Sequence, residues 1–323
     1  MPTPFPTRSS ALRAPWRPPA LLTLALTLLT GATSSHADRV VAITIDDLPV
    51  VAVSSASDWA DVTERLLGTL QRHHVPAVGF VNERKLYANG ALDSSRVALL
   101  ARWLAAGQEL GNHTFAHRSA HTTPLAEYLE DITRGEQVTR VLARRAGRPY
   151  RYFRHPQLHT GRSLAYRRSV ERFLAAHGYT VAPVTVDNQE WVYARAYVAA
   201  LERGDSALVD RVVDNYQRHL DSAFAFSERL SRHLFDREIP LVLLLHANQI
   251  NADYLDAILS RLEGRGYRFA PLERVLADSA YRSKDTYVGA MGLSWLIRWA
   301  LSRGMQVPAE PREEPWVAEL AMP

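Results

Sequence analysis

The chain has 323 residues, of which 47% are hydrophobic, 22% charged and 9% aromatic, a composition typical of a folded globular protein and not of a disordered or fibrous one. Residues 1–37 hold three of the 38 basic residues and no acidic residue, which leaves 35 basic against 34 acidic residues in the remainder. This near balance argues against a nucleic-acid partner. The absence of cysteine excludes disulfides, thiol nucleophiles and thiolate metal ligands.

The amino-terminal residues have the pattern of an export signal. Three arginines precede an apolar run at residues 20–29, and small residues follow as far as Ser35-His36-Ala37. This order predicts a signal peptide over residues 1–37. An uncleaved anchor or a Tat-type signal is the alternative, although the run is shorter than the roughly 20 residues of a spanning helix. We expect export to the periplasm or the extracellular space, without stable membrane insertion after cleavage.

From residue 40 onward, short β-branched runs alternate with amphipathic stretches, an order that predicts strands followed by helices. The predicted strands are 40–45, 77–81, 109–112, 152–153, 179–184, 241–245 and 267–269. The predicted helices are 58–73, 94–106, 124–146, 163–177, 192–236 with a break at Gly204-Asp205, and 251–264. Repeated β-then-α units indicate an α/β fold with a parallel sheet, most simply a closed or distorted barrel.

Polar side chains follow the predicted strands at their carboxyl ends. In chain order they are Asp46 and Asp47, His113 and His117, Arg154, Asp187 and Trp191, and His246. Because the carboxyl ends of parallel strands meet at one rim of a barrel, we expect these residues to lie together. Neighbouring strand residues point to opposite sides, so Asp46 and Asp47 are expected to point differently, one binding metal while the other remains a base.

The histidine pair has the spacing of a metal chelate. His113 and His117 are four residues apart, which places both imidazoles on one side of a turn. Two histidines and one aspartate give three protein ligands, the open arrangement in which water completes a catalytic site. A metal held in this way lowers the pKa of its water and polarises a carbonyl group.

These residues resemble the motif series of the polysaccharide deacetylase family, also called the NodB-homology or carbohydrate esterase family 4 domain. The five similar segments, in order, are Thr44-Ile45-Asp46-Asp47-Leu48, Asn112-His113-Thr114-Phe115-Ala116-His117, Arg151-Tyr152-Phe153-Arg154-His155-Pro156, Val186-Asp187-Asn188-Gln189-Glu190-Trp191 and Leu244-Leu245-His246. The resemblance covers residues 38–280. It implies a distorted (β/α) barrel of seven or eight units, with a helical insertion at 192–236 between the fourth and fifth motifs. Residues 281–323 are treated as a C-terminal tail.

The resemblance also implies a metal site and a base. Asp47, His113 and His117 would hold a divalent metal, with zinc the default for these borderline ligands and cobalt or nickel able to substitute. Asp46 would take a proton from water, and Arg154 would pair with Asp46 to keep it ionised and oriented.

The same resemblance implies an acid and a substrate pocket. His246 would protonate the departing amine, and Asp187 would hold His246 or balance its charge. A backbone N–H near Gln157 would help to stabilise the oxyanion, and Trp191 would form one wall of the acetyl pocket.

The resulting prediction is a secreted, metal-dependent hydrolase that removes acetyl groups from an N-acetylated glycan or oligosaccharide. Three departures from the family pattern concern the substrate: Leu48 stands in place of a glycine, His155 in place of a proline, and Gln157-Leu158 where an aromatic residue and a glycine are common. Two alternatives therefore remain open. One is hydrolysis of a non-sugar amide or an O-acetyl ester on the same fold, and the other is a non-catalytic glycan-binding or envelope-scaffold protein. The oligomeric state is not predicted.

Overall fold

A computed structural model describes residues 1–6, 39–54 and 59–322. Contacts divide the chain into two units, Met1–His36 and Ala37–Pro323. Residues 1–6 are exposed and have no regular secondary structure, and the rest of the predicted signal peptide, with its cleavage site, lies outside the described residues. Among the described helices, none combines the length and the hydropathy needed to cross a bilayer.

All the helices and strands among the described residues belong to the second unit. Its strands are β1 (Arg39–Leu48), β2 (Val78–Val81), β3 (Tyr87–Ala88), β4 (Ala91–Leu92), β5 (Glu109–Asn112), β6 (Tyr152–Phe153), β7 (Thr180–Val181), β8 (Leu241–His246) and β9 (Tyr267–Phe269). Its α-helices are α1 (Trp59–Arg72), α2 (Ser94–Ala105), α3 (Leu125–Arg134), α4 (Thr139–Arg145), α5 (Leu164–Ala176), α6 (Glu190–Glu202), α7 (Ser206–Phe235), α8 (Gln249–Gly264), α9 (Leu272–Leu276), α10 (Trp295–Ser302) and α11 (Pro315–Leu320). Short 3-10 helices lie at Glu83–Leu86, Pro156–Leu158 and Ser279–Arg282.

The main sheet has seven strands and confirms the predicted α/β barrel type. Its order is β7-β6-β5-β2-β1-β8, with β9 paired to the start of β1, and every pairing is parallel. The residues just after β7 pair with β8 through a parallel bridge between Val186 and Leu243. The segment from β7 to Val186 therefore pairs with β6 on one side and with β8, at the other end of the sheet, on the other side. This pairing curls the sheet into a distorted barrel.

Alternate residues of β1 explain how the curled sheet carries polar groups to its rim. Val40 and Ala42 belong to a small inner core with residues from β2, β6 and β8. Thr44 and Asp46 continue the same face, and Arg154 reaches both of them across the two intervening strands β5 and β2. The inner face thus changes from apolar to polar toward the carboxyl end of β1.

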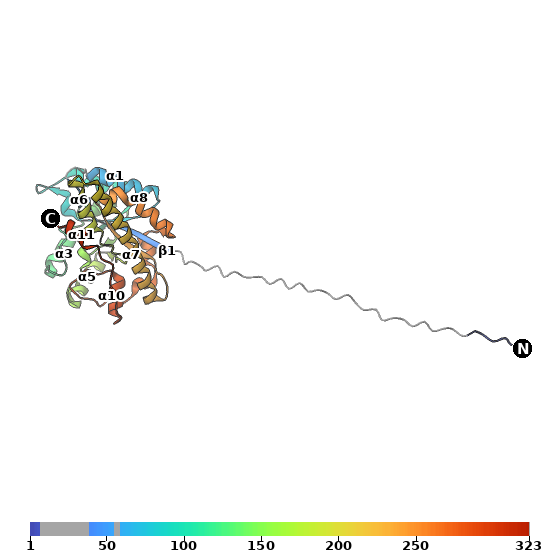
Figure 1. The fold of residues 1–323 in the computed structure, drawn as a ribbon. Coiled ribbons are helices and arrows are strands. Elements are labelled where there is room, and N and C mark those ends of the chain that lie inside the picture. Colours follow the sequence, from blue (N-terminus) through green and yellow to red (C-terminus); the bar gives the residue numbers. More distant parts are fainter. Residues whose placement is uncertain (7–38, 55–58, 323) are drawn as a thin grey trace. The chain divides into compact units, whose positions relative to one another are not determined.

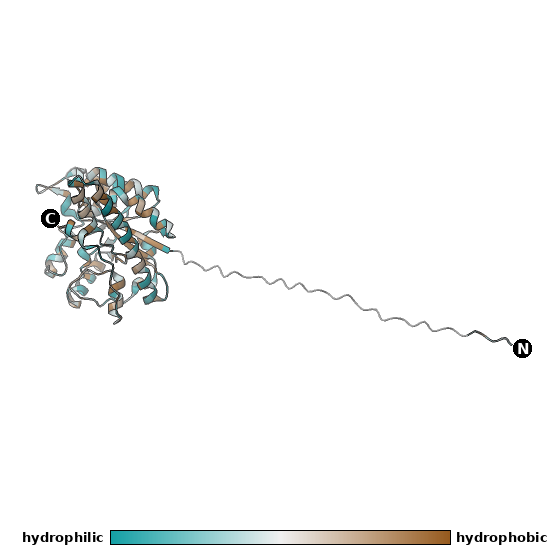
Figure 2. Ribbon diagram, viewed as in Figure 1, coloured by the Kyte–Doolittle hydropathy of each residue, from teal (hydrophilic) through white to brown (hydrophobic). Residues whose placement is uncertain are grey.

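Helices surround this sheet, with α1 beside α8 and α6 beside α7 and α11 (Figure 1). Along these helices hydrophobic and hydrophilic residues alternate, as Figure 2 shows. In α1, the buried residues Val62, Leu66 and Leu70 recur at helical spacing, so one face of the helix packs on the sheet while the opposite face meets water. The larger core cluster lies between the helices and the sheet.

The single helix predicted over 124–146 is wrong, because the structure has α3 and α4 there. Helix α3 ends at its C-cap residue Gly135, where a Cβ would lie 2.4 Å from the carbonyl carbon of Thr114. The buried carboxylate of Glu83 then accepts the backbone N–H groups of Val138 and Thr139 at the start of α4. These contacts are long-range, and the helical periodicity of the segment does not reveal them.

The region predicted as a helical insertion forms α6 and α7, which meet near the predicted break at Gly204-Asp205. Residues after 281, to which the sequence assigned no element, form α10 and α11. In α10, Trp295, Leu296, Ile297 and Trp299 are buried in the main core.

Candidate metal centre and active site

Asp46 and Asp47 converge on one place, contrary to the expectation that neighbouring strand residues point apart. The pairing of β1 with β2 shifts register between Ile45 and Leu48, and Asp47 has a left-handed φ of 68°. This bulge turns Asp47 back toward the inner face. As a result, Asp46 Oδ2 lies 3.7 Å and Asp47 Oδ1 3.8 Å from His113 Nε2.

The two histidines lie in the loop after β5 and not on a helix. Thr114 and His117 both have positive φ, and the side-chain hydroxyl of Thr114 accepts the backbone N–H of His117 at 3.0 Å. The carboxylate of Asp131 accepts the N–H of Ala116. These bonds fold the loop so that the imidazole centroids of His113 and His117 are 4.9 Å apart.

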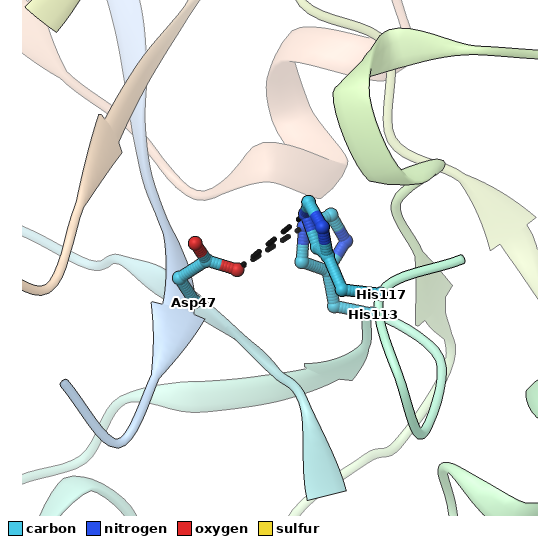
Figure 3. Close-up of side chains that lie close together, drawn as sticks. All are labelled: Asp47, His113 and His117. Carbon is cyan, nitrogen blue, oxygen red and sulfur yellow. Dashed lines mark ion pairs between the residues drawn. The ribbon is translucent and has the colours of Figure 1, made fainter. Parts of the chain in front are cut away.

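Asp47, His113 and His117 form the candidate metal centre. Their ligand atoms all lie within 4.8 Å of one another, and Figure 3 shows the Asp47 carboxylate facing both rings. Asp47 Oδ1 is buried without a hydrogen-bond partner, 3.6 Å from His117 Nε2. An unpartnered buried carboxylate oxygen facing imidazole nitrogens is suited to share a cation with them.

The protonation of these groups also suits a cation. Burial lowers the pKa of His113 and of His117 to about 4, so both rings are neutral at neutral pH and can offer lone pairs. His113 Nδ1–H donates to the carbonyl of Arg154 at 2.8 Å, which leaves Nε2 free to bind a metal. The residues therefore fit a divalent metal with one Asp and two His ligands.

A second carboxylate, Asp46, is paired as predicted with Arg154. Both side chains are buried, and Arg154 Nη1 lies 3.3 Å from each oxygen of Asp46. Burial raises the pKa of Asp46, while the Arg154 charge opposes that rise. Arg154 is held by Ala182 O and Thr44 Oγ1 and lies over the Phe80 ring, so Asp46 is oriented by a rigid partner.

His246 ends β8 as predicted, but its hydrogen-bond partner is Glu190. His246 Nδ1 lies 2.7 Å from Glu190 Oε2, and Asn248 donates to the other carboxylate oxygen. Burial alone would lower the pKa of His246, but the Glu190 carboxylate outweighs it and raises that pKa to about 9. Asp187 was the residue predicted to hold His246 or balance its charge. Its carboxylate instead accepts the N–H of Gln189 at 3.2 Å. Its charge remains within range of His246 and Arg154.

The two predicted substrate residues lie at exposed positions. Trp191 is 46% exposed, and the Arg195 guanidinium lies 5.3 Å from its ring centroid. Gln157 is exposed with φ 56°, and a Cβ on Gly292 would lie 1.9 Å from its carbonyl oxygen. The C-terminal segment therefore passes directly against the loop that carries Gln157.

Residues 33–182 match the model of a family described as polysaccharide deacetylase. This part of the chain belongs to the polysaccharide deacetylase family. The matched residues include the candidate metal centre and the Asp46–Arg154 pair and end before Asp187, Glu190 and His246. Family members are generally metal-dependent deacetylases of carbohydrates. A search of curated proteins found no match.

Several solved structures are similar to this chain. A polysaccharide deacetylase from Bacillus cereus is 20% identical, with 72% of this chain and 91% of that chain covered and a TM-score of 0.48. A family 4 acetyl xylan esterase from Clostridium thermocellum in complex with a cobalt ion is 20% identical, with 74% and 91% covered and a TM-score of 0.45. A CE4 family pseudoenzyme from Bacillus anthracis is 18% identical, with 74% and 66% covered and a TM-score of 0.47.

Three charged residues in or near the candidate site were not identified from the sequence. Lys85 donates to the carbonyl of Asp47 at 2.8 Å and lies 3.8 Å from Asp47 Oδ2. Glu190 holds His246, and burial together with the nearby Asp187 charge raises the pKa of Glu310 to about 7. A weak signal existed for Lys85, because the chain has only two lysines. Glu190 lies within the fourth motif, but the resemblance assigned the partner role for His246 to Asp187 of the same motif.

Proposed function

We propose that this protein is an exported, metal-dependent hydrolase that removes acetyl groups from N-acetylated carbohydrate. The observation that carries the proposal is the unpartnered Asp47 Oδ1 facing two neutral imidazoles, beside the Asp46–Arg154 pair. A divalent metal held by Asp47, His113 and His117, with zinc our first choice, would supply Lewis-acid activation of water and polarisation of the acyl carbonyl.

The protein's own groups would then move the protons. Asp46, held by Arg154, takes a proton from the attacking water as the new bond to the acyl carbon forms. His246, kept protonated by Glu190, gives a proton to the nitrogen as the C–N bond breaks. Acetate and a free amine leave. Arg154 remains charged throughout and fixes the direction of the Asp46 lone pairs.

The first prediction concerns Asp46. We expect Asp46→Asn to lower acetate release from N-acetylglucosamine oligomers by about 10²- to 10⁴-fold, the usual contribution of a general base, while the protein still binds one equivalent of zinc. The measurement strips the metal from the purified protein, restores it, and follows acetate release and bound zinc together. Asp47→Ala is the control, because it should lose both metal and activity.

Unchanged turnover in Asp46→Asn would refute the role of that carboxylate. Absence of acetate release from every sugar tried, with zinc still bound, would refute the carbohydrate proposal. The same assay would then be run on peptide-derived amides and O-acetyl esters.

A further inference from the structure

An open pocket of about 600 Å³ lies beside the candidate metal centre, within the range of about 300–1,000 Å³ that is common for ligand sites. Its walls come from the loop after β5, the loop after β6 and the C-terminal segment at Ala290. Arg118 follows the candidate ligand His117 directly. Ser119, two residues after His117, lies with its hydroxyl oxygen 2.7 Å from Nδ1 of His159 on the opposite loop. The pocket lining therefore begins at the residue next to a candidate metal ligand.

The charged residues that line the pocket are all positive. Of the nine residues that line it, two are arginines, three carry hydroxyl groups and none is acidic. Arg118 contacts Glu127 at 2.7 Å and lies 4.0 Å from Asp131, both outside the lining. Arg162 is exposed and makes no ion pair with any residue in the described ranges. Arg162 therefore supplies the unbalanced positive charge.

The two histidines of the pocket are neutral and ordered. The rings of His121 and His159 stack with centroids 3.9 Å apart. The Ser119 hydroxyl oxygen accepts the backbone N–H of His121 and lies 2.7 Å from His159 Nδ1, while His121 Nδ1–H donates to the carbonyl of Ala290. Burial lowers the pKa of His159 to about 4. These side chains thus add fixed polar groups without adding charge.

We propose that this pocket is a subsite for an oxyanion carried by the substrate, a carboxylate or a phosphate, with Arg162 as its main charged contact. A guanidinium with no carboxylate partner favours a planar or tetrahedral oxyanion. The hydroxyl groups beside it can donate to the remaining oxygens. The inference rests on the proposed function, which places the acyl group at the metal centre, and narrows the substrate to acidic N-acetylated sugars.

The test compares sugars that differ in charge. Zinc-loaded protein is titrated calorimetrically with N-acetylglucosamine, with its 3-O-lactyl ether, which adds a carboxylate, and with its 6-phosphate. Acetate release is measured in parallel. The titrations are repeated with Arg162→Gln and with Arg168→Gln, an exposed arginine of α5 outside the pocket lining whose loss changes the net charge equally.

We expect one of the two acidic sugars to bind about tenfold or more tightly than the neutral sugar, as a charge-assisted hydrogen bond allows. The preference should disappear in Arg162→Gln and persist in Arg168→Gln. Preference for the lactyl ether identifies a carboxylate site, and preference for the 6-phosphate a phosphate site. Equal binding of all three sugars, no binding of any, or a preference that survives Arg162→Gln would overturn the subsite. A preference without acetate release from any sugar would support the subsite and refute the deacetylase proposal.

Discussion

Glu190 decides how His246 can act. A histidine buried at the end of an apolar strand would ordinarily be neutral, because burial penalises its charged form. The Glu190 carboxylate at 2.7 Å reverses this and raises the pKa of His246 to about 9. His246 is therefore protonated at neutral pH, as a general acid must be. Glu190 itself contacts His246 and Asn248, so it is a positioning residue.

Replacing Glu190 tests this relation. In Glu190→Gln the pKa of His246 should fall, because burial then acts without an opposing carboxylate. Activity that needs protonated His246 is lost as pH rises through that pKa. The alkaline limb of the kcat profile should therefore move from near pH 9 to lower pH by at least about one unit, and kcat at pH 8 should fall at least about twofold.

The matched control is Asp187→Asn, which removes a nearby charge without removing the hydrogen bond to His246. It should shift the alkaline limb less than Glu190→Gln does. A larger shift in Asp187→Asn would assign the partner role to Asp187, as the sequence analysis proposed. Profiles that coincide for wild type and Glu190→Gln would show that Glu190 does not control His246.

At the level of elements, the junction between α3 and α4 holds the metal-binding loop. Gly135 ends α3, and its backbone lies against Thr114, between the two candidate ligands. Asp131, in the last turn of α3, accepts the N–H groups of Phe115 and Ala116 with its carbonyl and carboxylate oxygens. The helix break that the periodicity missed is thus the feature that lets α3 approach the loop.

Gly135→Ala should therefore weaken zinc binding at a distance from the ligands. The added Cβ would meet the Thr114 backbone at 2.4 Å, and neither backbone can yield without moving His113 or His117. We expect zinc affinity to fall about tenfold, in line with the effect of losing an outer contact at a metal site, measured by competition with a chelator. Gly264→Ala is the control, because its Cβ would meet no heavy atom within 4 Å. Equal zinc affinities in the two variants would contradict the proposal that the contact of Gly135 with Thr114 holds the metal-binding loop in place.

At the level of the whole molecule, the C-terminal residues are part of the core. Arg298 of α10 is fully buried, donates to Thr160 Oγ1 at 2.6 Å and to Leu158 O at 3.4 Å, and pairs with Asp285 at 2.8 Å. The same segment meets Gln157 at Gly292. Residues 281–323 therefore brace the loop of the third motif, in addition to covering the larger core.

A chain that ends after residue 280 should fail to fold cooperatively. The four large apolar residues of α10 contribute about 1.5–3 kcal/mol each, so their combined loss is comparable to a net stability of about 5–15 kcal/mol. Circular dichroism during thermal unfolding would test this. A chain ending after residue 302 keeps α10 and should unfold cooperatively at a lower temperature, since Val317 and Leu320 of α11 are the only buried core residues that it loses from the described part of the chain. A cooperative transition in the shorter chain would confirm the domain boundary predicted at residue 280.

The sequence by itself determined most of the order of strands and helices as far as residue 269, and the polar residues at the strand ends. Period-two and helical patterns are local, and the rule that parallel strands end at one rim needs no coordinates. These signals predicted the barrel type and brought one of two aspartates together with His113 and His117, and the resemblance to the deacetylase family implied that the aspartate is Asp47.

Only the tertiary structure decided how those residues are oriented and paired. The bulge that turns Asp47 toward His113, the break at Gly135, and the choice of Glu190 over Asp187 as the partner of His246 all depend on contacts between residues far apart in the chain. Such contacts leave no local periodicity. Asp187 and Glu190 belong to one motif, and the sequence does not show which of the two carboxylates the backbone places against the His246 imidazole. The sequence did not predict α10 for the same reason, because its apolar residues are buried by contacts with distant parts of the core.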